Sequence, residues 1–508
     1  MVLSRRAVVS SIGGMVPLFA FAAAVPRAQE DPLYGEPVDF PEDYVLNLAR
    51  ARAEKPFEEE KVTLPPPLGE ISYDQYRDIR FDPARSIWKD TGSRFTFDLF
   101  HSGSLYKTPV DIYVVEGSSQ RRVNYVPQLF IFGQSVTPPP ANTVLPFAGL
   151  RLRYPINNPE IWDEFAVFLG ASYFRGVGKD QIYGLSARGL AINTASAEGE
   201  EFPYFRAFWV RRPPDGANAI VVHALLDSPS TTGAYRFTLR PGETTLMDVE
   251  ARLFPRNDLG HAGFAPLTSM FLFDSTNRNR FDDFRPAVHD SSGLQMLTGK
   301  GEWVWRPLSN PSKLQISAFV DQGPQGFGLM QRTRGYVDFD DLEAHYERRP
   351  SLWIEPVGDW GAGHVELVEI PSDREINDNI VVYWRPQQPI AKGTEYALTY
   401  RLHWCNDWPA EMAVARTVST AQGLNWNQDA RKFVVEFAGG DLSGEISATV
   451  STGAGEIKNT VVQYNPETKG HRLKFELDPK GAELVELWAQ LKRGETPVSE
   501  LWLYRWTA

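Results

Sequence analysis

The chain has 508 residues, a hydrophobic content of 42%, an aromatic content of 12% and a net charge of −12 at neutral pH. This length and composition predict a large folded core and argue against a disordered chain. Lys and Arg form no basic block, so nucleic acid and anionic membrane surfaces are poor partners, and a neutral polymer remains open.

The first residues are typical of an export signal. Arg5 and Arg6 precede an apolar run, SIGGMVPLFAFAAAV (11–25), and Arg27 follows it. Paired arginines before such a run indicate twin-arginine export, and the run is shorter than the roughly 18–20 residues that span a bilayer. We predict that residues 1–28 are removed, and that the product is periplasmic in a host with two membranes and has no stable membrane insertion.

The elements after this signal are mostly short strands. Residues 29–68 are rich in acids and prolines, and apolar spacing within 43–57 predicts one helix. From residue 75 onward, alternating segments recur between Gly, Pro, Asn and Asp clusters. The clearest strand patterns are 95–100, 110–115, 219–226, 235–239 and 314–320, and the clearest later helical pattern is 338–349. The pattern therefore favours an all-β fold with a large antiparallel sandwich.

A second domain is predicted near the C-terminus. The segment RPQQPIAKGTE (385–395) has two prolines and no periodicity. Several short alternating segments follow it, and Val485, Leu487, Ala489 and Leu491 are expected to share one face. This pattern is typical of an immunoglobulin-like β-sandwich. We predict three parts: a sandwich domain over 29–387, a linker over 388–394 and an immunoglobulin-like domain over 395–508.

Several classes of site are not supported by any motif. The histidines form no metal-binding pattern, and FDSTNRNRFDD (273–283) lacks the ligand spacing of a calcium loop, so it is expected to be a polar turn. GLSAR (184–188) has Arg where a nucleophile elbow needs its second Gly. The single cysteine, Cys405, is expected to be a small buried apolar residue. No metal and no cofactor are predicted.

Carboxylates beside aromatic residues are suited to a saccharide cleft. Asp378 precedes a buried-strand pattern, Asp290 follows His289, and Tyr346 and Trp353 flank a basic segment. Sugar rings stack on Tyr and Trp, and glycosidase chemistry needs one acid and one base. The same residues have structural alternatives, because an Asp at a strand entrance is often a turn cap and a Trp in a β-protein is often core.

Several long stretches resemble a known family. They are 168–192, 264–271, 289–294, 301–332, 346–356 and 378–386. Together they are similar to the periplasmic glucan biosynthesis proteins G and D (OpgG/OpgD, also MdoG/MdoD), from about residue 38 to the end. The resemblance implies a galactose-mutarotase-like β-sandwich followed by a small immunoglobulin-like domain. It also implies a role in making osmoregulated periplasmic glucans, which are β-1,2-linked glucose polymers. The twin-arginine signal looks more like the D branch.

The resemblance further implies functional residues. Asp378 of DNIVVYW matches the family's general acid, and Asp290 of HDS matches its proposed base, which acts on water through a relay in an inverting mechanism. Residues in the matching segments that are expected to bind substrate are Tyr173, Arg188, His289, Tyr346, Trp353 and Trp384. The loops beside the two acids depart from some relatives, so hydrolysis and transglycosylation both remain open.

Three functions remain compatible with these residues. The leading hypothesis is an enzyme that cleaves or remodels β-1,2-glucan. The second is a non-catalytic glucan-binding scaffold that partners the inner-membrane glucan glucosyltransferase, because immunoglobulin-like domains often dock proteins. The third, a mutarotase-type sugar epimerase, rests on fold analogy alone.

Overall fold

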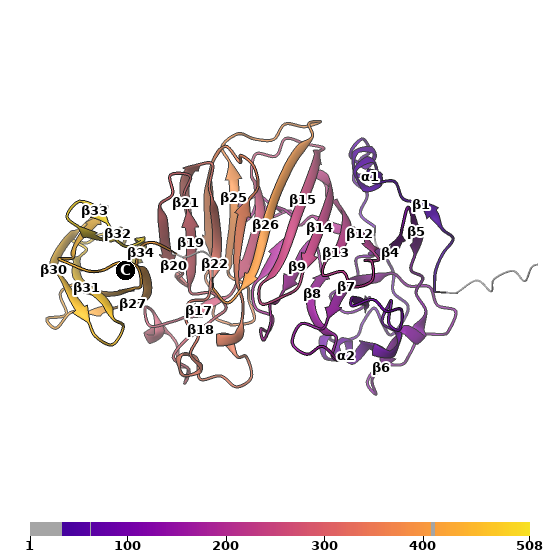
Figure 1. The fold of residues 1–508 in the computed structure, drawn as a ribbon, viewed down its shortest axis with the longest axis horizontal. Helices are drawn as coiled ribbons and strands as arrows, with labels where there is room; N and C mark the ends of the chain where they lie inside the picture. Colours follow the sequence, from indigo (N-terminus) through magenta and orange to yellow (C-terminus); the bar gives the residue numbers. More distant parts are fainter. Residues whose placement is uncertain (1–32, 61, 408–411) are drawn as a thin grey trace, which may run out of the picture.

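The computed structural model describes residues 33–60, 62–407 and 412–508, and nearly all of their regular structure is β (Figure 1). The signal predicted for residues 1–28 lies outside the described residues. The predicted first helix is confirmed as α1 (Tyr44–Ala53). The five strand predictions are confirmed as β3 (Thr96–His101), β4 (Asp111–Glu116), β13 (Ile220–Asp227), β14 (Thr231–Arg240) and β21 (Gln315–Gln322).

One 16-stranded sheet runs through both parts of the molecule. In sheet order its strands are β1 (Val38–Asp39), β5 (Ser119–Arg122), β4, β12 (Tyr204–Arg211), β13, β14, β15 (Thr245–Pro255), β26 (Tyr396–Cys405), β23 (Ser351–Pro356), β22 (Gly326–Met330), β19 (Gly293–Leu297), β20 (Trp303–Pro307), β34 (Leu501–Thr507), β32 (Leu484–Arg493) and β29 (Ser447–Thr452), with β33 (Thr496–Pro497) beside β32. Helix α1 packs against β13, β14 and β15 of this sheet.

A 10-stranded sheet packs against the first one and carries the candidate site. Its order is β21, β24 (Ala362–Glu369), β25 (Ile380–Pro386), β16 (Ala262–Ser269), β10 (Ser186–Arg188), β9 (Tyr173–Gly176), β8 (Asp163–Leu169), β7 (Phe147–Tyr154) and β3, with β11 (Ala191–Ile192) beside β16. Phe174 of β9 contacts Phe237 of the first sheet, 5.2 Å between ring centroids. Because side chains alternate along a strand, Tyr173 and Arg175 lie on the opposite, outer face.

The C-terminal part is a smaller sandwich at one end of the molecule, in yellow in Figure 1. Its second sheet contains β27 (Arg416–Leu424), β28 (Arg431–Ala438), β31 (Gly470–Asp478) and β30 (Glu456–Asn465). Residues Val485, Leu487, Ala489 and Leu491 are all buried in its core, as predicted. A short parallel pairing of β20 with β34 joins the two sandwiches. The prediction of an all-β fold with two sandwiches is therefore confirmed.

The strand pairing does not favour a second domain that starts at residue 395, as the sequence predicted. Strand β26 lies between β15 and β23, in the middle of the large sheet. Its alternate residues Leu398, Tyr400, Leu402 and Trp404 are buried in the large core, which explains the placement. We propose to place the boundary after β26, between Cys405 and Arg416. Cys405 itself is buried, as expected for a small apolar residue.

The helix predicted over 338–349 is wrong. The segment forms no α-helix: the 3-10 turn η4 (Tyr336–Asp338) ends at its first residue, and it contains one further 3-10 turn, η5 (Tyr346–Arg348). The Asp341 carboxylate accepts the backbone N–H groups of two following residues, and such local side-chain bonds compete with helix formation. His345 has left-handed backbone, φ 46°, which ends any helical run before η5.

The remaining elements lie near the ends of the sheets. They are α2 (Tyr73–Arg77), the pair β2 (Ile79–Phe81) and β6 (Phe130–Phe132), and the pair β17 (Phe271–Phe273) and β18 (Val288–His289). Residues 273–283 form a polar turn that includes η3 (Arg278–Arg280), as predicted. Within the described residues, the helices are all too short or too polar to cross a membrane.

Candidate active site

Asp378 lies at the end of the loop that enters β25, and its neighbour Asn379 anchors that loop. The Asn379 side chain is buried, donates to the carbonyl oxygens of Phe271 (2.9 Å) and Ile370 (3.0 Å), and accepts the Phe271 N–H (2.8 Å). Asn377 is exposed, and its side chain donates to the Ser372 hydroxyl at 3.5 Å. Asn379 therefore has a structural role. Its hydrogen bonds hold the backbone next to Asp378 in place, while the Asp378 carboxyl stays accessible.

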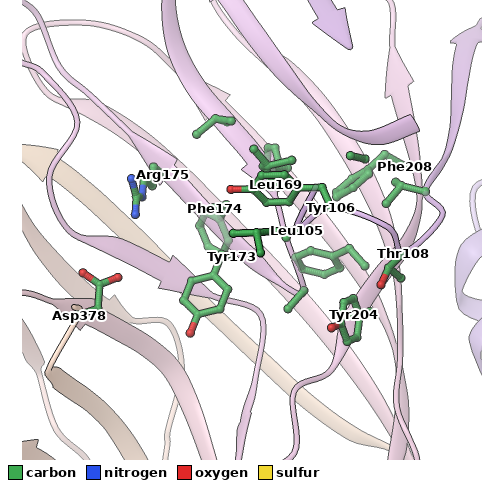
Figure 2. Close-up of a pocket in the computed structure, with 17 residues that line it drawn as sticks. Leu105, Tyr106, Thr108, Leu169, Tyr173, Phe174, Arg175, Tyr204, Phe208 and Asp378 are labelled. Atoms are coloured by element: carbon green, nitrogen blue, oxygen red, sulfur yellow. The ribbon is translucent and has the colours of Figure 1, made fainter. Parts of the chain in front are cut away.

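Asp378 lines a cavity of about 430 Å³. Figure 2 shows Asp378 and Arg175 at one end of this cavity, with aromatic side chains extending away from them. The lining is mainly apolar and includes the rings of Tyr106, Tyr173 and Tyr204. Among the described residues that line it, Asp378 is the only acid. An elongated, aromatic-lined cavity with an acid at one end has the features that a sugar chain requires.

The environment of Asp378 favours its protonated form. The side chain is accessible, but surrounding protein atoms partly desolvate the carboxyl and raise its pKa. The positive charges of Arg175 and Arg349 act in the opposite direction without cancelling the effect. A carboxyl that keeps its proton closer to neutral pH is suited to general acid catalysis.

Asp290 is not among the residues that line the cavity, but its carboxyl interacts electrostatically with Asp378. Its backbone N–H donates to the Met270 carbonyl oxygen (2.8 Å), and its buried carboxylate pairs with Arg349. Burial raises the pKa of Asp290, Arg349 opposes this, and the charge of Asp378 raises it further. The structure thus brings the two predicted acids within range of each other's charge, together with the same two arginines.

Tyr346 lies next to Arg349, the partner of Asp290, whereas Tyr173 and Arg188 lie at the cavity. Tyr173 lines it directly. Arg188 is buried, with its guanidinium over the Tyr173 ring (5.1 Å) and in an ion pair with Glu200 (2.7 Å), so it supports the tyrosine from behind. Tyr346 is buried beneath Arg349, 4.2 Å from guanidinium to ring, and its hydroxyl donates to Glu375 (3.2 Å).

Three of the predicted substrate contacts do not reach the cavity. The side chains of Trp353 and Trp384 are 0% exposed, so neither ring has a free face for a sugar, and both belong to hydrophobic cores. His289 is buried, with its ring stacked on Phe271 (5.3 Å) and against Phe339 (5.0 Å). Burial lowers the pKa of His289 to about 3, so it is neutral. Of these three residues, only His289 is the chain neighbour of Asp290. The two tryptophans pack elsewhere, against Trp303 and Trp360.

Sequence reasoning did not identify Arg175, Arg349 and Tyr106 as members of the site. Arg175 is two residues after Tyr173 on β9, so strand alternation alone places it on the same outer face. No ion pair joins Arg175 to an acid within the described part of the chain. Tyr106 and Arg349 come from loops, and no local periodicity marks them.

A second polar cluster lies on the outer face of β24 and β25. Glu366 accepts hydrogen bonds from His261 (3.1 Å), His364 (2.9 Å), Tyr383 and Arg385 (3.2 Å). Burial acts to raise the pKa of Glu366, but the bonds from His261, His364 and Tyr383 outweigh it and hold the pKa low. No cluster of metal-ligating residues is found within 33–60, 62–407 and 412–508.

The chain is similar to known proteins over almost all of its length. A family described as periplasmic glucan biosynthesis protein, MdoG, matches residues 40–506. Glucans biosynthesis protein G of Shewanella frigidimarina (strain NCIMB 400) is 52% identical, over 93% of this chain and 86% of the relative. The protein of the same name from Bradyrhizobium diazoefficiens is 50% identical, over 96% of this chain and 97% of the relative.

Solved structures give weaker matches. The galactosidase domain of alpha-galactosidase-sucrose kinase AgaSK has a TM-score of 0.25 and 11% identity, over 43% of this chain and 29% of that one. This score is too low to support an argument. The relatives above carry the name of protein G, and the D-branch assignment stays a prediction. The family match and the identities together show that the chain belongs to the periplasmic glucan biosynthesis protein (MdoG) family.

Proposed function

We propose that the protein acts in the biosynthesis of osmoregulated periplasmic glucans by cleaving or remodelling their β-1,2-glucan backbone in the periplasm. Family membership supports a role in glucan biosynthesis, because the family and the relatives are named for it. The observation that carries the chemistry is an acid in the cavity lining together with a second, buried acid whose pKa it affects. Asp378 is accessible with a raised pKa, and the buried Asp290 lies within range of its charge.

Asp378 is the general acid in this proposal. It donates its proton to the glycosidic oxygen as the bond from that oxygen to the anomeric carbon breaks. The partial desolvation of Asp378 keeps the proton available, and Arg175 stabilises the carboxylate that remains after transfer. The rings of Tyr106, Tyr173 and Tyr204 supply apolar faces for the sugar units.

Asp290 is the general base, acting through a relay. Its carboxylate is almost completely buried and paired with Arg349, so an attacking water does not contact it directly. The water oxygen bonds to the anomeric carbon from the opposite face, and its proton passes through an intervening hydroxyl or water to Asp290. If a sugar hydroxyl attacks in place of water, the same two acids perform transglycosylation.

The test is incubation of the purified mature protein with linear β-1,2-glucan, with the products followed by mass spectrometry and by NMR of the new anomeric centre. Short oligosaccharides released as the inverted anomer establish an inverting glucanase. Cyclic or rearranged glucans establish a transglycosylase. An intact polymer, under conditions where binding is observed, refutes both.

That last result would favour a second candidate, a glucan-binding scaffold that partners the inner-membrane glucan glucosyltransferase. The separate C-terminal sandwich supports it, because its four-stranded sheet β27, β28, β31 and β30 is an additional surface beyond the cavity. The scaffold function predicts a pulldown of the glucosyltransferase that depends on residues 416–508. Full glucan synthesis without that interaction would contradict it.

A further inference from the structure

The two sandwiches are joined by a buried ion pair that leads toward Asp290. Arg332, which follows β22, makes a bidentate pair with Glu500, which precedes β34, at 2.6 and 3.0 Å. Their side chains are 7% and 0% exposed. Arg332 also donates to the Thr417 carbonyl oxygen (2.7 Å), and its guanidinium lies 3.5 Å from the centre of the Trp305 ring. Two segments of the C-terminal part therefore hold the Arg332 guanidinium, one through Glu500 and one through Thr417.

Hydrogen bonds continue from Arg332 to the segment that carries Asp290. The backbone N–H of Arg332 donates to the Ser292 hydroxyl (3.0 Å), which donates to the Gln331 side-chain oxygen (2.7 Å). The Gln331 side-chain N–H in turn donates to the His289 carbonyl oxygen (3.0 Å). The residues on both sides of Asp290 are thus tied to Gln331 and Arg332.

We propose that Arg332 and Glu500 are positioning residues for Asp290, so that the C-terminal sandwich is a structural part of the catalytic centre. Neither residue lines the cavity that begins at Asp378, and neither touches substrate in this proposal. Their effect passes through Ser292 and Gln331 to the backbone at Asp290. The effect on catalysis rests on the proposed function. The ordering of the Asp290 segment by the Arg332–Glu500 pair does not, because it can be measured without turnover.

A buried ion pair elsewhere in the chain provides a matched control. Arg256 pairs with Asp227 at 2.8 Å, with side chains 7% and 1% exposed, close to the values for Arg332 and Glu500. Arg256 contacts the end of α1 through the Arg52 carbonyl oxygen and has no bond to the Asp290 segment. Arg256→Lys therefore reproduces the general cost of disturbing a buried arginine.

The experiment compares Arg332→Lys, Glu500→Gln and Arg256→Lys in the full mature chain, at a temperature where each is folded. Amide hydrogen exchange is measured at residues 288–293, where the Asp290 N–H is bonded to Met270 and the Ser292 N–H to Met330. We expect exchange there to rise at least about tenfold in the first two variants and to stay unchanged in the third. Equal exchange in all three variants would overturn the proposal.

Kinetics on linear β-1,2-glucan provide the second measurement. For Arg332→Lys and Glu500→Gln we expect kcat to fall about tenfold or more with KM nearly unchanged, since positioning acts on the reacting geometry. The acidic limb of the pH–rate profile, which reports the pKa of Asp290, should also move. The reason is that this pKa depends on the distances from Asp290 to the surrounding charges, such as those of Arg349 and Arg175. Glu500→Asp, which keeps the carboxylate, should recover part of the rate.

The two proposals fail in different ways. An inactive wild-type protein refutes the proposed function, while the exchange comparison still decides whether the interdomain pair orders the Asp290 segment. An active wild type in which Arg332→Lys and Arg256→Lys lose rate equally refutes the positioning role alone.

Discussion

Replacing Asp378 with Asn removes the transferable proton and keeps the size of the side chain. General acid catalysis contributes about 10²–10⁴-fold, or roughly 2.7–5.4 kcal/mol at 1.36 kcal/mol per tenfold. Burial raises the pKa of the cavity tyrosines Tyr106 and Tyr173, so they are poor substitutes as acids, and no second carboxyl lines the described cavity. We therefore expect kcat on linear β-1,2-glucan to fall toward the upper end of this range.

The pH profile provides a second readout of the same substitution. A general acid acts when protonated, so the wild-type rate should fall as the pH rises through the raised pKa of Asp378. This alkaline limb should disappear in Asp378→Asn. The acidic limb, where Asp290 titrates, should stay nearly in place, because in this assignment Asp378 is already protonated and uncharged at that pH.

A substrate with a good leaving group separates proton donation from other effects. An aryl β-glucoside needs little protonation, so the ratio of wild-type to variant rates should shrink on it. The control is Asp373→Asn, an acid in the same loop whose side chain is 86% exposed. A wild-type rate for Asp378→Asn on β-1,2-glucan, or an equal loss in Asp373→Asn, would refute the assignment.

Three further predictions concern the residues around the site. Asn379→Ala removes three hydrogen bonds to the backbone, so urea titration should show the free energy of unfolding reduced by about 3 kcal/mol, whereas the exposed Asn377→Ala should change it by less than about 0.5 kcal/mol. Trp384→Ala should lower the free energy of unfolding by about 3–5 kcal/mol and leave KM for the folded protein unchanged; weakened glucan binding at full stability would place the ring in the cleft instead. Hydrogen bonds hold the pKa of Glu366 low in the folded state, so its stabilisation is present above about pH 4.3, the pKa of an unfolded Glu, and is lost as the pH falls. Glu366→Gln should therefore flatten the acid dependence of unfolding, and identical curves for both proteins would contradict this.

Local patterns in the sequence were sufficient for the all-β class, for α1 and for the strand segments named above. Alternation in Val485, Leu487, Ala489 and Leu491 correctly placed all four in a core, because side chains on a strand repeat every two residues whatever strand lies beside it. The same rule failed at 338–349, where apolar spacing suggested a helix. There the Asp341 carboxylate bonds to the backbone and the chain turns, which a count of apolar positions does not detect.

The sequence by itself therefore determined the all-β class, the first helix and the strand segments named above, whereas the roles of the two acids that the family resemblance singled out stay predictions. Only the tertiary structure decided that β26 belongs to the large sheet, that Trp353 and Trp384 are core, and that Arg175 and Arg349 accompany Asp378. The physical reason is that alternation shows that one face of a strand is buried, but it does not show against what. The identity of that partner depends on segments that are distant in the sequence, and so does the placement of two acids on different loops.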